Sequence, residues 1–335
     1  YNDIYETEVD YTTYSSNVTG YDGEGQITSA LAYVTSEDMP VFYTLEGQDE
    51  LGLSTAFQNG LEKQNAQLQS INLLTQESVP EDAQGVLIMA PVTDISADDA
   101  DKLIAYLDKG GKILMTTAYM EDFAEEMPNL QKVLDYFGLT IEKGLVIEGD
   151  SSMYYQQPAY LLPDVAYDTL TKGISGEKYI FMPYAQGIRS EEKEDVTLTP
   201  LLTSSEASYS KLNMNQAQNY EKEDGDAEGP FDVGIHAEKK LEEGTAGLTL
   251  FTSENLFTDN ANSMVADANL TLFTNTVASM SDSKESVSVP VKSYEASMIT
   301  INDGTAFTLG ALFMLLLPLG LLIAGILVWM ERRKR

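Results

Sequence analysis

The chain has 335 residues, with 20 Lys or Arg, 53 Asp or Glu and one His, so its formal net charge is −33. It has no cysteine, which excludes a thiol nucleophile, a disulfide framework and a cysteine zinc cluster, and one histidine cannot build a histidine-rich metal site. We therefore expect no metal and no cofactor. The acidic charge would repel a phosphate backbone, so we also expect no nucleic-acid partner. Disorder is not implied, because 43% of the residues are hydrophobic.

Residues 1–26 are rich in Tyr, Thr and Asp in rough alternation, which is typical of strand fragments left from a truncated upstream β region. From residue 27 to about 150 the spacing of apolar residues alternates between that of a helix and that of a strand. The expected helices cover residues 27–36, 51–65, 96–109 and 129–137. Leu53, Phe57 and Leu61 are spaced by four on one face of the second helix. Ser96, with Asp99 three residues on, predicts a cap at the start of the third. The expected strands cover residues 40–45, 68–74, 85–90, 112–117 and 139–147.

These βα units predict an α/β domain with a parallel, flavodoxin-like sheet and helices on both faces. Its strands read as apolar runs, as buried parallel strands do. Residues 151–228 predict an irregular, β-containing insertion. Residues 229–280 return to strands over 230–237 and 248–252 and a helix over 267–280, which we expect to pack on the first sheet. Residues 281–303 predict a juxtamembrane linker or edge strand.

Residues 304–330 contain no ionisable side chain, and the run is long enough to cross about 30 Å of hydrocarbon at about 1.5 Å per residue. It predicts a C-terminal transmembrane helix in contact with the lipid bilayer. The basic tail over 331–335, with Arg332, Arg333, Lys334 and Arg335, marks the cytoplasmic side. Residues 1–303 are then extracytoplasmic. Because the tail holds four basic residues and one acidic residue, residues 1–303 hold 16 basic and 52 acidic residues, a net charge of −36.

The chain begins at Tyr1 without a secretory signal, so we expect a further span upstream that delivered the domain across the membrane. Export without any disulfide is ordinary in a bacterium and unusual for a eukaryotic surface protein. The sequence therefore predicts a bacterial cell-membrane protein.

The order of several segments is similar to one known family. These segments are ITSALAYV, PVFYTLEGQDE, VPEDAQGVLIMAP followed by TDISADDADKLIAYLDKGGKILM, GLTLFTSENLF, and the terminal run ending in WMERRKR. Together they resemble the GldG-like family of auxiliary proteins of uncharacterised ABC-type transport systems, over about 27–147 and 229–335. The resemblance implies an extracytoplasmic domain with an amidotransferase-like fold beside an ABC permease and an ATPase. Where the family commonly has Gly-His-Gly-Glu, this chain has Glu46-Gly47-Gln48-Asp49, so no role of that histidine transfers.

Amidotransferase-like enzymes need a nucleophile on a strained strand-to-helix elbow and a nearby histidine. The elbow candidate here, residues 118–121 after the strand 112–117, is Ala-Tyr-Met-Glu. A serine triad would have to use His236, which the alternating strand FDVGIHAE places as an ordinary exposed strand residue. ATP hydrolysis is excluded because no GxxxxGK[ST] motif occurs. We expect no enzyme and no catalytic residue.

The abundant carboxylates suggest two further hypotheses about a site. Asp224-Gly225-Asp226 resembles the start of a calcium loop, but Ile235 occupies the twelfth position, where a bidentate Glu is required, so a solvated acidic turn is the better interpretation. A glycosidase would need a pair of carboxylates, and the composition offers many pairs, but the sequence singles out none of them.

One edge of the sheet is favoured by architecture. In an open parallel sheet, ligands bind beyond the carboxyl ends of the strands. The residues expected there form a candidate rim: Gln48, Asp49, Glu50, Asp94 and Glu121. Loop and cap roles are the simpler explanation of these residues, since negative charge before a helix is favourable anyway. A functional rim would suit a cationic ligand, a metal ion or a basic protein surface, of identity unknown.

The sequence therefore predicts a non-catalytic, membrane-anchored auxiliary subunit of a bacterial ABC-type transport system. The alternative is a membrane-tethered ligand-binding or sensory ectodomain without a transporter partner. A carboxylate hydrolase is a third hypothesis, which would require activity to depend on acids such as Asp94 and Glu121.

Overall fold

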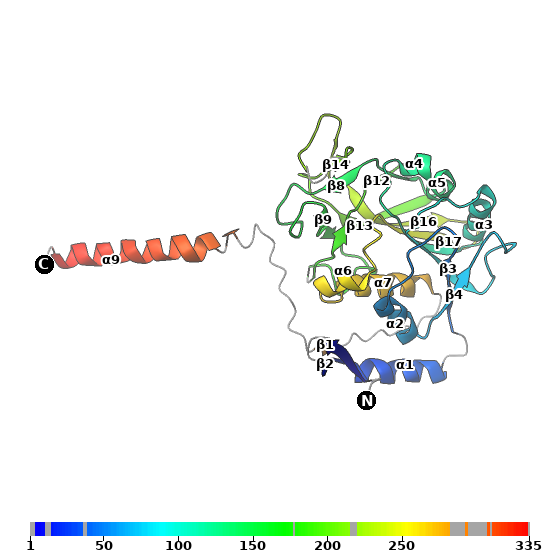
Figure 1. The fold of residues 1–335 in the computed structure, drawn as a ribbon, viewed down its shortest axis with the longest axis horizontal. Coiled ribbons are helices and arrows are strands. Elements are labelled where there is room, and N and C mark those ends of the chain that lie inside the picture. The colour runs from blue at the N-terminus through cyan, green and yellow to red at the C-terminus, as the bar shows by residue number, and fades with distance from the viewer. Residues whose placement is uncertain are drawn as a thin grey trace.

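The computed structural model describes residues 4–10, 15–35, 39–176, 178–214, 220–281, 292–293, 307–308 and 310–333. Its main body is built on a ten-stranded sheet covered by helices on both faces (Figure 1). Along the sheet the order is β10-β13-β16-β17-β6-β5-β3-β4, with β12 and β7 attached beside β16.

The parallel half of the sheet contains the strands that carry the expected βα pattern. They are β3 (Val41–Leu45), β4 (Gln67–Ile71), β5 (Ala83–Met89), β6 (Lys112–Thr116) and β17 (Thr245–Phe251). Each neighbouring pair among β4, β3, β5, β6 and β17 is parallel. The predicted parallel sheet is confirmed here, and β17 confirms that the late strands return to it.

The other half of the sheet is antiparallel, which the sequence did not predict. It consists of β16 (Asp232–Lys240), β13 (Val196–Thr203), β10 (Asp164–Val165), β12 (Ile188–Ser190) and β7 (Leu139–Ile141). The reason is the short connection between β16 and β17, which turns at Gly244 with φ +80°. A link of that length closes a hairpin, whereas a parallel neighbour needs a crossover of a dozen residues or more.

One face of the sheet is covered by α2 (Thr55–Lys63), α6 (Asp259–Met264) and α7 (Ala268–Met280). The predicted spacing of Leu53, Phe57 and Leu61 is confirmed, since all three are buried in one core cluster. Phe57 contacts Phe273 of α7 edge-on, with 5.3 Å between the ring centroids. Aromatic packing thus joins α2 to α7 across long sequence separation.

The opposite face is covered by α3 (Ala97–Leu107), α4 (Phe123–Glu126) and α5 (Pro128–Asp135). Leu103 and Leu107 of α3 pack with Leu130 and Val133 of α5 in a second cluster. The predicted cap is also confirmed, because the Ser96 hydroxyl accepts the Asp99 N–H at 3.1 Å. Helices therefore lie on both faces, as expected.

The strand expected over 139–147 is two strands that belong to different sheets. β7 joins the main sheet, whereas β8 (Leu145–Ile147) joins a small sheet with β14 (Tyr209–Lys211) and β15 (Ala227–Glu228). The break falls at Gly144, whose φ is +88°. A Cβ there would lie 2.6 Å from the Lys211 carbonyl oxygen, so this turn requires glycine.

Residues 151–228, predicted as an irregular β-containing insertion, supply β10, β12 and β13 to the main sheet. In the same region, β9 (Tyr160–Leu161) pairs antiparallel with β11 (Met182–Pro183). The buried Asn269 side chain of α7 accepts from the Phe181 N–H at 3.2 Å and donates to the Phe181 carbonyl at 2.8 Å. This asparagine of α7 therefore holds the residue next to β11 against the helix.

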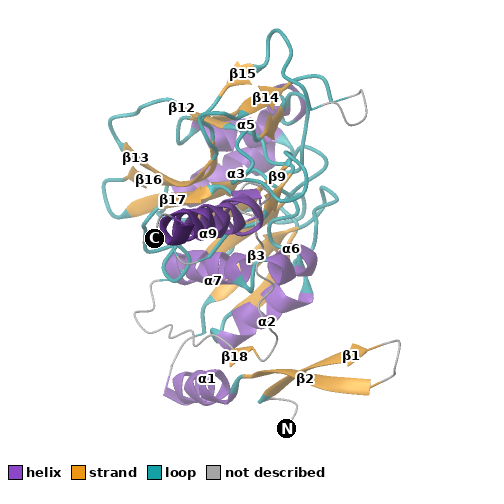
Figure 2. Cartoon of the chain, turned by 90° about the vertical axis from the view of Figure 1, so that its left-hand side faces the viewer, coloured by secondary structure: helices purple, strands orange, loops and turns teal. Residues whose placement is uncertain are grey.

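The N-terminal residues form a small sheet of β1 (Tyr5–Asp10), β2 (Ser15–Tyr21) and β18 (Lys292–Ser293), next to α1 (Gly23–Thr35) (Figure 2). The helix expected from residue 27 thus begins at Gly23. An ion pair of 3.0 Å between Lys63 of α2 and the buried Asp22 links this unit to the main body. Of the expected linker 281–303, only residues 281 and 292–293 are described.

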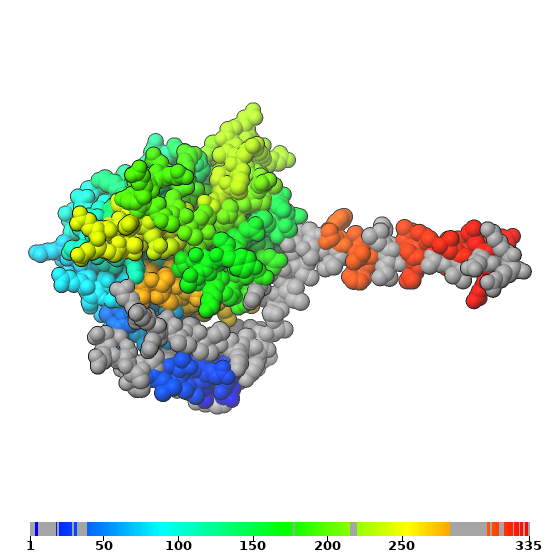
Figure 3. Space-filling model, turned by 180° about the vertical axis from the view of Figure 1, so that it is seen from behind, coloured from blue at the N-terminus to red at the C-terminus, as the bar shows by residue number. Residues whose placement is uncertain are grey.

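The C-terminal helix comprises a π-helical turn over Leu312–Leu316 and α9 (Leu317–Arg333), and it projects from the main body (Figures 1 and 3). Among the described residues, no helix has both the length and the apolar character needed to cross a membrane. Within the run expected as one transmembrane helix, the described residues 307–308 and 310–330 are helical.

Candidate functional site

The strand order places a topological switch point between β3 and β5. From β3 the chain passes through α2 to β4 on one side, and from β5 it passes through α3 to β6 on the other. The loops after β3 and β5 therefore meet at the carboxyl edge of the sheet, where open α/β sheets hold their ligands. This is the edge at which the candidate rim was predicted.

Gln48, Asp49 and Glu50 form a tight loop at this point. One carboxylate oxygen of Glu50 accepts from the Gly47 and Gln48 N–H groups at 3.1 and 2.9 Å. The Gln48 carbonyl accepts from Val92 and Thr93 at 3.0 and 3.3 Å. Asp49 is exposed with φ +54°. The loop after β3 is thus fastened to the loop after β5 through backbone groups.

Two acceptor atoms of this loop are buried without a donor. Gln48 is 6% exposed, and within the described part of the chain neither its Oε1 nor the Glu50 Oε1 meets a hydrogen-bond donor. Buried acceptors of this kind cost free energy unless they are paired. They make this loop the part of the predicted rim with unused hydrogen-bonding capacity.

Asp94 has a different role from the other rim residues. Its carboxylate accepts from the backbone N–H groups of Asn129 and Leu130 at 2.9 and 3.0 Å, and from the Asn129 side-chain amide at 2.8 Å. The residue that precedes α5, Met127, makes no side-chain cap. Asp94 therefore caps α5 from a distant loop, which is the loop-and-cap interpretation.

Glu121 lies apart from Gln48 and Glu50, on a separate acidic pocket after β6. The pocket has a volume of about 510 Å³ and is lined by Glu121, Asp122, Glu125, Glu126, Lys143, Leu212 and Asn213. Lys143 forms an ion pair with Asp122, and this contact raises the pKa of the Lys143 ammonium. The predicted single rim is therefore divided into a β3–β5 loop, a helix cap and an acidic pocket.

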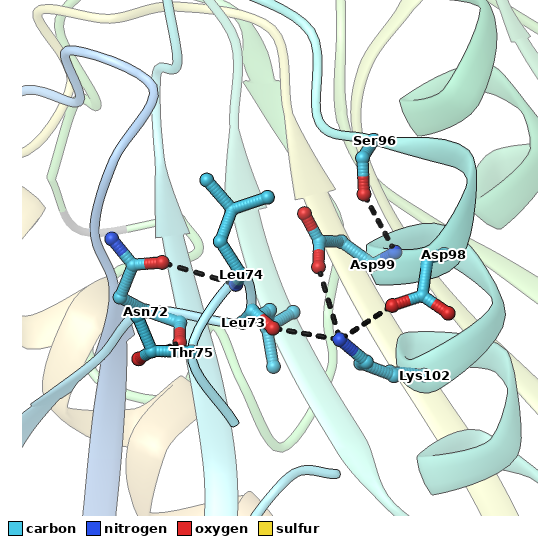
Figure 4. A network of polar contacts seen from close by, with 8 residues as sticks. All are labelled: Asn72, Leu73, Leu74, Thr75, Ser96, Asp98, Asp99 and Lys102. Atoms are coloured by element: carbon cyan, nitrogen blue, oxygen red, sulfur yellow. Dashed lines mark hydrogen bonds and ion pairs between the residues drawn. The ribbon is translucent and has the colours of Figure 1, made fainter. Parts of the chain in front are cut away.

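Next to this edge, Lys102 connects α3 to the loop after β4 (Figure 4). Its ammonium lies 2.7 Å from the Leu73 carbonyl and 2.6 Å from the Asp98 carboxylate, with the buried Asp99 at 3.5 Å. Asn72 fixes the same loop by accepting the Leu74 N–H at 3.0 Å. The acids at the start of α3 are thus structural partners of Lys102.

The predicted elbow after β6 has no nucleophile and no free backbone N–H at Met120. The Met120 N–H donates to Gln186 Oε1 at 3.0 Å, and the Gln186 side-chain amide donates to the Met120 carbonyl at 2.8 Å. A left-handed residue does follow a strand in this sheet, but it is Ala90 after β5, with φ +47°. Its methyl group cannot attack a substrate, so the elbow chemistry of an amidotransferase has no nucleophile at either strand end.

His236 is more enclosed than predicted. Its side chain is 21% exposed, because β16 lies inside the sheet between β13 and β17. It lines a cavity of about 120 Å³ with Lys112, Ile113, Glu238, Thr245, Gly247, Thr249, Ser279 and Met280. Its Nδ1 lies 2.9 Å from the Thr249 hydroxyl. Burial lowers the pKa of His236, although Glu238 and Asp168 oppose this shift.

The acidic turn predicted at Asp224-Gly225-Asp226 is only partly solvated. Asp226 is buried and accepts from the Leu212 and Glu223 N–H groups at 3.1 and 2.8 Å. The ammonium of the buried Lys211 lies 3.1 Å from Glu223 and 3.7 Å from Asp226. Asp226 therefore serves to close this loop. In the described residues, no three His, Asp or Glu side chains are arranged to hold a metal ion.

Sequence reasoning missed Gln186 and Lys211, which organise the surroundings of the site. A lone glutamine in the run YIFMPYAQGI and a lone lysine after a short strand carry no pattern of their own. The available signal was weak: polar residues inside apolar runs must find partners when they are buried.

Comparison with known proteins now identifies the family. The model of the family described as an ABC-type uncharacterized transport system, auxiliary component, matches residues 40–308, and the chain belongs to this family. The predicted resemblance is thereby confirmed. No curated protein matches the chain.

Solved structures show the fold alone. The N-terminal domain of mmIFT52 superposes with a TM-score of 0.55 at 13% identity, covering 74% of this chain and all of that one. A glutamine amidotransferase from Thermotoga maritima gives a TM-score of 0.42 at 10% identity over 74% of this chain and all of that one. The first shares the α/β architecture, and the second likeness is too slight to support an argument.

Proposed function

We propose that the chain is a non-catalytic, membrane-anchored auxiliary subunit of a bacterial ABC-type transport system, with its α/β domain outside the cytoplasmic membrane. The observation that carries the proposal is the family match over residues 40–308. Its partners are then an ABC permease and an ATPase, since this chain has no phosphate-binding GxxxxGK[ST] motif.

The non-catalytic role is supported by the chemistry at the carboxyl edge. Ala90 occupies the left-handed position after β5, and the Met120 N–H after β6 is bonded to Gln186. An acyl-transfer enzyme would need a nucleophile and free N–H donors at such a position. The rim loop of Gln48 and Glu50, with its buried acceptors, is then a surface for binding and not for turnover.

The membrane anchor and the orientation rest on the sequence. Residues 304–330 have no ionisable side chain, and the basic residues Arg332 to Arg335 follow them. We propose that this segment attaches the domain to the bilayer with the tail in the cytoplasm. Lys334 and Arg335 lie outside the described residues.

The test is purification of the natural full-length protein from its own membranes in mild detergent. Co-purification of a polytopic permease and an ATPase with a phosphate-binding motif is the expected result. Repeated recovery of the protein alone, or with a kinase or regulator, would contradict the transporter role and favour a sensory ectodomain. Addition of an external protease to intact spheroplasts, which should cleave the α/β domain and spare the tail, tests the orientation separately.

A further inference from the structure

Tyrosine and glutamine side chains from three segments gather on one surface of the insertion. This tyrosine surface consists of Tyr155, Gln156, Gln157, Tyr160, Tyr184 and Tyr220. In Figure 1 the strand β9, which carries Tyr160, lies on the side of the main body away from α3. The surface is therefore separate from the network around Lys102.

The hydroxyl and amide groups on this surface form a continuous hydrogen-bond network. The Tyr220 hydroxyl donates to Gln157 Oε1 at 3.1 Å, and the Gln157 amide donates to the Tyr184 hydroxyl at 3.5 Å. The Tyr184 hydroxyl in turn lies 3.4 Å from that of Tyr160. Hydrogen bonding to Tyr184 raises the pKa of Tyr160, and burial raises that of Tyr220, so these phenols remain uncharged at neutral pH.

The rings form a right-angled arrangement. Tyr160 and Tyr184 are 5.3 Å apart between centroids at 84°, and Phe181 lies edge-on to both Tyr160 and Tyr155. Phe181 is buried and is itself held by Asn269, so the tyrosines stand on a rigid base. A preordered aromatic surface loses little conformational entropy when a ligand binds.

Tyr184 occupies a position that folding alone would not assign to tyrosine. Its φ is +57°, and 36% of its surface is accessible. Left-handed backbone costs a bulky residue about 1–2 kcal/mol, which glycine would avoid. The edge-on contact with Tyr160 returns only about 0.5–1.5 kcal/mol. Gln156 on the same surface is also left-handed, with φ +61°.

The six side chains of the tyrosine surface are uncharged, although the protein is strongly acidic. Neither residues 151–163 nor residues 179–188, which supply all of the surface except Tyr220, contain an Asp, Glu, Lys or Arg, although 22% of the chain is charged. A net charge of −33 disfavours anionic polymers, and the absence of carboxylates in these segments disfavours cations. The net charge of the protein and the uncharged side chains of this surface together favour an uncharged ligand.

From these observations we infer that the tyrosine surface binds a neutral oligosaccharide. Aromatic rings offer apolar contact to the C–H faces of sugar rings, while phenols and glutamine amides both donate to and accept from sugar hydroxyls. Proline-rich peptides, the other uncharged ligands of aromatic surfaces, need few such side-chain hydrogen bonds. The inference does not depend on the transporter partnership, so either can fail without the other.

The test is titration of the full chain in detergent with neutral hexasaccharides of glucose, mannose and N-acetylglucosamine, followed by calorimetry and by saccharide saturation-transfer NMR. Binding of at least one of them with a Kd of about 1 mM or tighter is expected. Tyr184→Gly should weaken it by about tenfold or more while leaving thermal stability unchanged or higher, because glycine relieves the left-handed strain.

The matched control is Tyr167→Ala, since Tyr167 is 87% exposed and lies outside both uncharged segments. This variant should bind as the parent does. Binding that Tyr184→Gly leaves intact would overturn the inference. Absence of binding to every hexasaccharide up to about 10 mM, or binding of a proline-rich decapeptide in their place, would overturn it as well.

Discussion

The side chain of Gln186 pairs with both backbone groups of Met120, accepting its N–H at 3.0 Å and donating to its carbonyl at 2.8 Å. The same amide also donates to the carbonyls of Glu142 and Gly144 at 3.1 and 3.2 Å. One fully buried glutamine therefore fixes the loop after β6 and the turn between β7 and β8.

Replacing Gln186 with Leu should lower the free energy of unfolding by about 3 kcal/mol, because Met120, Glu142 and Gly144 would lose buried partners at once. Urea unfolding followed by circular dichroism measures the change. Gln69→Leu on the exposed side of β4 is the control and should change stability by less than about 0.5 kcal/mol. Equal effects of the two variants would contradict the bridging role.

Gly144 should tolerate no side chain. Gly144→Ala combines left-handed strain with a Cβ 2.6 Å from the Lys211 carbonyl, so a loss of about 3 kcal/mol or more is expected. Gly173 is also left-handed, with φ +79°, but a Cβ there meets nothing within 4 Å. Gly173→Ala should therefore cost only about 1 kcal/mol. Thermal unfolding of both variants measures the difference, and its absence would mean that the β7–β8 turn can relax.

Asp94 should prove structural and not ligand-binding. Asp94→Ala removes the acceptor for the Asn129 and Leu130 N–H groups and should destabilise the protein by about 1 kcal/mol, as loss of a helix cap does. Asp101→Ala, an exposed position on α3, is the control for loss of charge. Amide hydrogen exchange at the start of α5 should accelerate only in Asp94→Ala. Unchanged exchange there would be evidence against the cap.

His236 should titrate below the ordinary range of histidine. Burial lowers the pKa of His236 below the ordinary histidine value of 6.5, so the folded state prefers the neutral ring. The unfolded chain then binds the proton more readily, and stability is present above about pH 6.5 and declines as pH falls toward the folded pKa. Because this is the chain's only histidine, selective isotope labelling gives one NMR signal whose midpoint reports the pKa directly.

His236→Gln should remove the histidine contribution to the pH dependence of the free energy of unfolding between about pH 7.5 and 5.5. This range includes the ordinary histidine pKa and lies above the ordinary pKa values of carboxylates. The difference between parent and variant isolates the histidine from the many acidic groups. A midpoint at or above 6.5 would show that Glu238 and Asp168 outweigh burial.

The sequence by itself determined the local elements of the parallel half. Leu53, Phe57 and Leu61 predicted the buried face of α2, and Ser96 predicted the start of α3, because helical spacing and capping are properties of adjacent residues. It likewise identified the family, whose motifs are contiguous strings. Composition alone excluded a thiol enzyme, since the chain has no cysteine.

Only the tertiary structure decided the relations between distant segments. Gly144 separates β7 from β8 because the Lys211 backbone approaches it, and His236 is enclosed because β13 and β17 flank its strand. Tertiary contacts also separate the residues of the predicted rim. Asp94 caps α5, and Glu121 lines a separate pocket. Gln48 and Glu50 lie together in the loop at the switch point. Residue spacing along a chain carries local geometry, whereas the partners of a buried polar or charged group come from whichever segment folds against it.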